Sequence, residues 1–162
     1  TFGEAYIKAQ MGAGERLPRP LLADGTPAGK VFLTVKNHDK PQAVQIARDL
    51  VAMGFALVAT RGTAAAIQAA GIACETVNKV TEGRPHVVDL IKNGGVSLVI
   101  NTVEERRNAI ADSRAIRTSA LAARVPTITT IFGAEAAVEG MKCVDQLGVI
   151  SVQEMHEKLS TP

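Results

Sequence analysis

Short apolar runs alternate with amphipathic segments along this chain, and that alternation is the feature that most restricts its fold. The run from Phe55 to Ala59 has five apolar residues and no charge, which is typical of a strand buried on both faces of a parallel sheet. Between such runs, apolar residues recur at the helical period. One such series is Val44, Ala47, Leu50 and Val51. Strands that alternate with helices predict the α/β class, with a parallel sheet between two helical layers.

The expected elements follow from periodicity, caps and breakers. Asp39 is expected to cap a helix that has Pro41 in its first turn and ends at Gly54. Capping-box spacings begin at Thr1 and at Ser151 and predict helices there. The expected strands are 31–35, 55–59, 72–77, 96–100 and 127–131, and the other expected helices are 1–11, 63–70, 86–92, 109–123 and 134–146.

Residues 12–29 contain four glycines and three prolines, a density that interrupts regular structure. This composition predicts either a linker or an ordered loop that packs on the domain. We therefore expect residues 1–11 to belong to a preceding link, residues 12–29 to be the linker, and residues 30–162 to form the folded domain with a helix at its carboxyl end. The first residue is Thr1 rather than Met, which suggests a fragment of a longer protein.

Composition excludes several classes of function. Aromatic residues make up 3% of the 162 residues, and none is Trp, so an aliphatic core suited to α/β layers is expected. The net charge is +2 and the basic residues are dispersed, which argues against a nucleic-acid partner. No apolar run is long enough to cross a membrane. Cys74 and Cys143 are isolated, which predicts free thiols in a reducing cytoplasm and no metal site.

Polar residues gather where the expected strands end, and this is where open α/β sheets bind ligands. Thr60 to Thr63 join a buried strand to an alanine-rich helix, so hydroxyls meet the unpaired N–H groups of a helix start, which favours an anion such as phosphate. Each Thr or Asn alone is explained as well by capping. Gly-rich dinucleotide and Walker motifs are absent. The predicted phosphate- and effector-binding residues are Lys40, Thr60, Arg61, Gly62, Thr63, Lys79, Asn101 and Thr102.

Four segments resemble the C-terminal regulatory domain of the carbamoyl-phosphate synthase large chain. The most specific is the block Asn-Lys-x-x-Glu-Gly-Arg-Pro-His within 77–86. The others are 98–102, 110–114 and 149–156, and residues 1–10 are similar to the family's link from the second ATP-grasp half. The resemblance covers essentially the whole chain.

The resemblance implies a methylglyoxal-synthase-like fold with five parallel strands in the order 3-2-1-4-5. It implies that the parent enzyme, a ligase, makes carbamoyl phosphate for arginine and pyrimidine synthesis, using ATP with Mg or Mn and a glutaminase small chain. This fragment is then expected to be non-catalytic, to need no cofactor of its own, and to bind a UMP- or IMP-type effector. The family holds the phosphate at positions matching Lys40, Thr60, Thr63 and Lys79, with Asn101 beside the nucleotide. Ribose and base contacts are expected near Val87, Asp112 and Ile116.

Two departures from the family pattern concern the effector. Two residues after Asn101, where family members commonly carry a hydroxyl side chain, this chain has Val103. At the position before two threonines, where ornithine-activated relatives carry an acidic residue, this chain has Ile128. Two other functions stay open. Methylglyoxal synthase itself shares the fold but uses a catalytic Asp after the third strand, where this chain has Asn78 and Lys79. The third interpretation is a module that oligomerises the large chain and binds no ligand, through possible homo-oligomer contacts.

Overall fold

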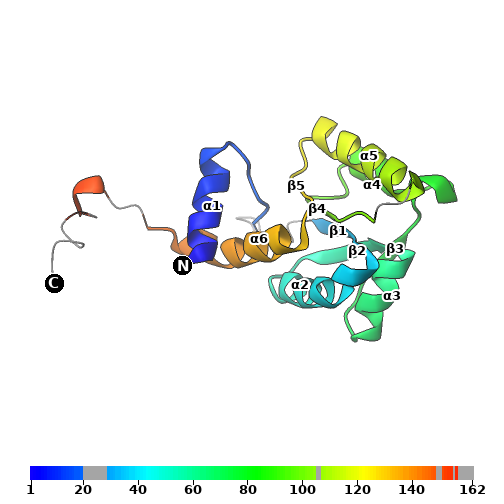
Figure 1. Ribbon diagram of the computed structural model, residues 1–162, viewed down its shortest axis with the longest axis horizontal. Helices are drawn as coiled ribbons and strands as arrows, with labels where there is room; N and C mark the ends of the chain where they lie inside the picture. Colours follow the sequence, from blue (N-terminus) through cyan, green and yellow to red (C-terminus); the bar gives the residue numbers. More distant parts are fainter. Residues whose placement is uncertain (20–28, 105–106, 149–150, 155, 157–162) are drawn as a thin grey trace.

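Five parallel strands form one sheet in the order β3-β2-β1-β4-β5, with helices on both faces (Figure 1). The computed structural model describes residues 1–19, 29–104, 107–148, 151–154 and 156. The strands are β1 (Lys30–Thr34), β2 (Ala56–Thr60), β3 (Glu75–Val77), β4 (Leu98–Asn101) and β5 (Thr127–Ile128). The α-helices are α1 (Phe2–Gly12), α2 (Lys40–Ala52), α3 (Arg61–Ala69), α4 (Val87–Lys92), α5 (Arg107–Ala122) and α6 (Ile131–Cys143), and the 3₁₀ turns are η1 (Asn37–Asp39), η2 (Val80–Glu82) and η3 (Val144–Gln146).

The central strand β1 pairs with β2 on one side and with β4 on the other. The chain runs outward from β1 to β3, then crosses back to β4 and continues to β5. The carboxyl ends of β1, β2 and β4 therefore meet where the direction of winding changes, the usual place for a ligand in an open parallel sheet. The expected α/β class and strand order are confirmed.

Two apolar layers enclose the sheet. Alternate residues of β1 point to opposite faces, so Val31 and Leu33 pack under α2, α3 and α6, while Phe32 packs under α4 and α5. Figure 1 shows the same division, with α4 and α5 above the sheet and α2 and α6 below it. Nearly all of this core is aliphatic, as the scarcity of aromatic residues predicts. Phe32 and Phe55 are the aromatic side chains in the core of the described residues.

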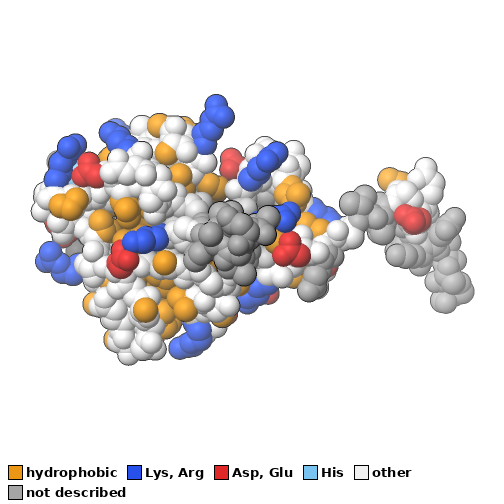
Figure 2. All heavy atoms as spheres, turned by 180° about the vertical axis from the view of Figure 1, so that it is seen from behind, with side chains coloured by type: hydrophobic (Ala, Val, Ile, Leu, Met, Phe, Trp, Pro, Cys, Tyr) orange, Lys and Arg blue, Asp and Glu red, His pale blue; other side chains and the backbone are white. Residues whose placement is uncertain are grey.

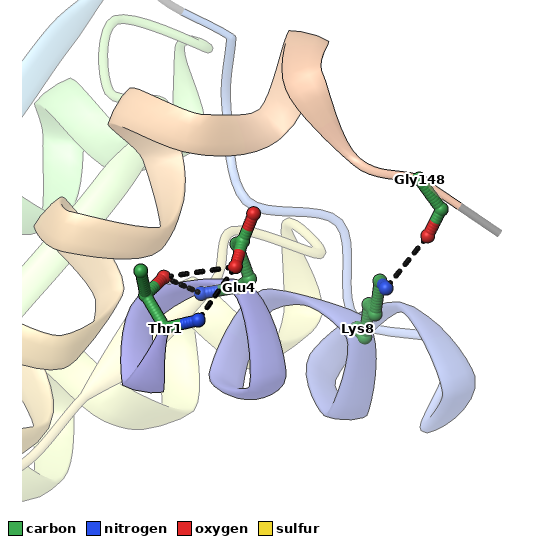
Figure 3. Close-up of polar contacts among 4 residues, drawn as sticks. All are labelled: Thr1, Glu4, Lys8 and Gly148. Carbon is green, nitrogen blue, oxygen red and sulfur yellow. Dashed lines mark hydrogen bonds and ion pairs between the residues drawn. The ribbon is translucent and has the colours of Figure 1, made fainter. Parts of the chain in front are cut away.

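Helix α1 packs against α6, although about 120 residues separate them in sequence (Figure 1). Gly3 and Gly140 allow the close approach: a Cβ on Gly140 would lie 2.9 Å from the Gly3 carbonyl oxygen and 3.0 Å from Cβ of Ile7. Ile7 is only 2% exposed. In Figure 3, the Lys8 ammonium donates to the Gly148 carbonyl at 2.7 Å. The residues expected to form an upstream link thus pack closely against the last long helix.

Both predicted capping boxes are present. Figure 3 shows Thr1 and Glu4 exchanging hydrogen bonds at the start of α1. Glu154 does the same with Ser151. The rest of the helix expected after Ser151 lies largely outside the described residues, as do residues 20–28 of the expected linker. Gly54 ends α2 as predicted, in a left-handed conformation with φ of +93°.

Two predictions about α2 are wrong. Asp39 precedes the helix, but its side chain makes no capping hydrogen bond, because its backbone is already in the η1 turn; instead it is buried near Lys36 and His38. Val51 was expected on the apolar face and is 41% exposed. The buried face of α2 contains Ala43 and Ile46 beside the predicted Ala47 and Leu50, so the apolar stripe of the helix is centred one position away from the predicted one.

Other boundaries differ as well: β4 begins at Leu98 rather than at residue 96, and α6 spans Ile131–Cys143 rather than 134–146. Three further differences have an identifiable cause. Helix α3 starts at Arg61 rather than Thr63, because Thr60 already occupies the position before the first turn. The third strand was expected over 72–77, but only its last three residues pair with β2, its one neighbour. The fifth strand was expected to reach residue 131, but Thr130 caps α6 by accepting from the Gly133 N–H at 3.1 Å and so ends the strand early.

Candidate functional site

A polar cavity of about 240 Å³ opens at the carboxyl edge of the sheet. Its walls come from the ends of β1, β2 and β4, the first turn of α3 and one face of α5, so the topology alone brings these segments together. The lining residues are Thr34, Val35, Lys36, Asn37, Lys40, Thr60, Gly62, Thr63, Lys79, Asn101, Thr102, Val103, Glu104, Ala109, Asp112, Ser113 and Ile116.

One end of the cavity is cationic. Thr60 precedes α3 in extended conformation, and its hydroxyl donates to Thr34 at 3.0 Å instead of capping the helix. The first N–H groups of α3 therefore lack a cap from Thr60, and Lys40 Nζ lies 3.5 Å from the position that a Cβ on Gly62 would occupy. Lys79 joins this wall from the loop after β3. Neither lysine forms an ion pair with a described residue, so both charges stay available to an anion.

Two threonine hydroxyls hold the loop that follows β1. Thr63 Oγ1 accepts the Val35 N–H at 3.2 Å, and Thr102 Oγ1 accepts the Lys36 N–H at 3.0 Å. Both side chains thus have a structural role, as the capping alternative expects. Each oxygen acts as an acceptor in that role, so each hydroxyl proton is left to donate toward the cavity.

Two residues that line the cavity carry buried polar atoms with no partner in the described part of the chain. Asn101 is 1% exposed; its Oδ1 accepts the Ser113 hydroxyl at 3.3 Å, but its Nδ2 makes no hydrogen bond. Asp112 accepts the Thr81 hydroxyl through Oδ2 at 3.4 Å, but its Oδ1 has no donor. An unmade buried hydrogen bond costs about 1–3 kcal/mol. A donor and an acceptor left open in one cavity indicate a polar ligand that supplies both.

The structure brings together nine of the eleven residues singled out in the sequence. The other two do not line the cavity: Arg61 is exposed at the first position of α3, and Val87, the first residue of α4, is fully buried in the core. Sequence reasoning missed Thr34 and Ser113. Thr34 could have been found as the last residue of the central strand, whereas Ser113 is one of several similar positions on α5 and gives no distinct signal.

Other classes of site find little support in the described residues. Their His, Cys, Asp and Glu side chains form no group of three that could hold a metal ion. None of their helices combines the length and apolarity needed to cross a bilayer. On the face seen in Figure 2, the Lys and Arg side chains stand apart around the outline rather than forming a stripe. Thr129 and Thr130, which follow β5, line a different hollow beside α1.

The model of the MGS-like domain matches residues 42–129, which include β2 to β4 and most of the cavity wall. The chain belongs to the MGS-like domain family. The strand order expected from the resemblance to this fold is the one observed.

Relatives of this MGS-like domain cover almost its whole length. It is 55% identical over 98% of its residues to the carbamoyl phosphate synthase large chain of Ralstonia nicotianae. It is 50% identical to the large chain of Pseudomonas putida and 49% to that of Neisseria meningitidis serogroup A, again over 98% of the domain. The chain spans 14% of the length of each of these proteins. The resemblance stated from sequence motifs is thus confirmed.

Proposed function

We propose that this MGS-like domain is the allosteric regulatory domain of a glutamine-dependent carbamoyl phosphate synthase large chain. In this role it binds a nucleoside monophosphate of the UMP or IMP type and tunes carbamoyl phosphate synthesis for the arginine and pyrimidine pathways. Its partners are the rest of the large chain and the glutaminase small chain, and the ATP and Mg or Mn chemistry takes place outside this segment. Support comes from relatives of that name that match the domain over 98% of its length.

The observation that carries the nucleotide proposal is the polarity of the cavity. Its cationic end, with Lys40, Lys79 and the start of α3, suits a phosphate group. Its lining also includes the Asn101 amide, a donor, and the Asp112 carboxylate, an acceptor, together with the apolar Ile116. A ribose hydroxyl donates to a carboxylate and a base carbonyl accepts from an amide, so one nucleotide satisfies both open atoms.

Calorimetric titration of the chain with UMP, IMP and uridine tests this proposal. We expect both nucleotides to bind and uridine to bind more weakly, because it lacks the phosphate. Lys79→Ala is expected to weaken UMP binding by about 1.5–3 kcal/mol, roughly ten- to hundredfold, and to leave uridine binding almost unchanged. Lys92→Ala, which removes an exposed lysine outside the cavity, serves as the matched control. Equal losses for UMP and uridine would mean that Lys79 does not hold the phosphate.

The same samples separate the two alternative functions. Production of methylglyoxal from dihydroxyacetone phosphate would identify a lyase, with Asp112 as a candidate carboxylate that lines the cavity. Flat titrations together with concentration-dependent dimerisation would identify an oligomerisation module. Regulation itself requires the intact synthase: a coupling free energy of about 1–3 kcal/mol between the nucleotide and the active sites would change the ATP kinetics when UMP is added. Tight UMP binding with unchanged kinetics would refute the regulatory role.

A further inference from the structure

A second hollow, of about 440 Å³, adjoins the nucleotide cavity along the outer side of α5. The two share Val103, Glu104 and Ser113 as a common wall. We call the second hollow the α5 groove; its remaining lining residues are Ile110, Arg114, Arg117 and Thr118.

Two guanidinium groups lie one helical turn apart in the α5 groove. Arg114 is exposed and Arg117 is half-buried, and neither forms an ion pair with a described residue. Arg117 Nη2 donates to the Asn101 carbonyl oxygen at 3.3 Å, while its Nε is buried and has no acceptor. Among the described lining residues the acidic one is Glu104, whose Oε1 accepts the Asn37 N–H at 3.1 Å. The groove therefore has an excess of positive charge and an N–H donor without a partner.

We propose that the α5 groove binds a small oxyanion, a phosphate or carboxylate group, held between Arg114 and Arg117. The planar fork of a guanidinium matches both groups, which accept two parallel N–H bonds. Spacing of three residues on a helix places the two side chains on the same face, so both can reach one anion. This site is separate from the cradle formed by Lys40 and Lys79, and it does not depend on the proposed nucleotide function.

The site also adjoins the nucleotide cavity through one residue. Arg117 donates to the backbone carbonyl of Asn101, and Asn101 lines the nucleotide cavity. An anion that draws the Arg117 guanidinium outward competes with the hydrogen bond to the Asn101 carbonyl. Binding of an anion in the α5 groove is therefore expected to weaken a hydrogen bond to Asn101, the last residue of β4.

NMR of the arginine Nε–H groups tests the proposal on the whole chain. The Lys40→Ala/Lys79→Ala variant silences the first cavity, and Arg117→Lys assigns the Arg117 signal by its loss. Inorganic phosphate and malonate are titrated separately at constant ionic strength, because exposed charge pairs are weakened by salt. We expect a saturable shift of the Arg117 signal with at least one of them, and the one that binds identifies the oxyanion class. Arg114→Gln is expected to raise the dissociation constant about tenfold; Arg48→Gln, on α2, is expected to leave it unchanged.

Two results would overturn the proposal. The first is a linear, non-saturating response to both anions, and the second is a response of the same strength in the Arg114→Gln variant. Neither result bears on UMP binding to the chain with both lysines intact, so failure of the α5 groove and failure of the proposed function are distinguishable.

Discussion

Substitution of Gly140 by Ala is expected to loosen α1 without weakening the sheet. The added Cβ would lie 2.9 Å from the Gly3 carbonyl oxygen and 3.0 Å from Cβ of Ile7, whereas comfortable contacts between such atoms are about 3.5–4.0 Å. Both obstacles belong to α1, one of them to its backbone, so α1 has to move away by several tenths of an ångström. Overpacking of this kind costs about 1–3 kcal/mol.

The same substitution strengthens α6 itself. Alanine favours a helix interior over glycine by about 1 kcal/mol, and α6 gains this whether or not α1 is docked. The two effects therefore have opposite signs in two neighbouring helices. We expect the free energy that holds α1 in place to fall by about 1–3 kcal/mol, which is roughly a five- to 150-fold increase in its opening equilibrium.

Native-state hydrogen exchange measures the two effects separately. Protection of the α1 amides at Ile7 and Lys8 is expected to fall in Gly140→Ala, while protection of the β4 amides stays the same or rises. Gly12→Ala is the matched control, because it adds the same methyl group to α1 at a position with no atom within 4 Å. Undiminished protection of α1 in Gly140→Ala, or an equal loss throughout the chain, would refute the argument.

Two further predictions concern titrating groups. The Asp89 carboxylate accepts the His86 N–H at the start of α4, and this hydrogen bond lowers the pKa of Asp89. The stability that it contributes is therefore present above pH 4 and is lost as the pH falls through the lowered pKa. In urea unfolding from pH 6 to pH 3, the free energy of unfolding should fall more steeply for the wild type than for Asp89→Asn. Burial, reinforced by the neighbouring Glu75, raises the pKa of Cys74 to about 11. Its alkylation at pH 8 should then be roughly a hundredfold slower in the folded chain than in urea, and equal rates in the two states would contradict this.

The alternation of apolar runs and helical stripes was sufficient to predict the class of fold. It was not sufficient to predict the order of the strands, because the sequence of a buried parallel strand does not indicate which strands pair with it. The order was predicted from the resemblance of sequence motifs to the family. Strand ends were also overextended. The length of an edge strand such as β3 is set by how many of its residues pair with its one neighbour. The sequence around Ile72 does not show that these residues extend beyond the pairing with β2.

The sequence placed residues at the candidate cavity where one topological rule applied, and it failed to do so where side-chain direction mattered. Parallel strands must end at a common edge, so Thr60, Asn101 and Lys79 could be placed together before the structure was known. Arg61 is adjacent to Thr60 in sequence, yet its side chain is exposed, because consecutive residues at a helix start point in different directions. Whether Asn101 Nδ2 and Asp112 Oδ1 have hydrogen-bond partners depends on the three-dimensional contacts of each side chain, which the sequence does not specify.

The docking of α1 on α6 has a consequence for biosynthesis. On the ribosome, Gly3 emerges well before Gly140, and at about 5–20 residues per second the delay is on the order of ten seconds. During that interval Ile7 has no groove in which to bury its side chain, and the sheet assembles without α1. Helix α1 precedes the other described helices in the sequence, yet it is expected to be among the last of them to reach its final position.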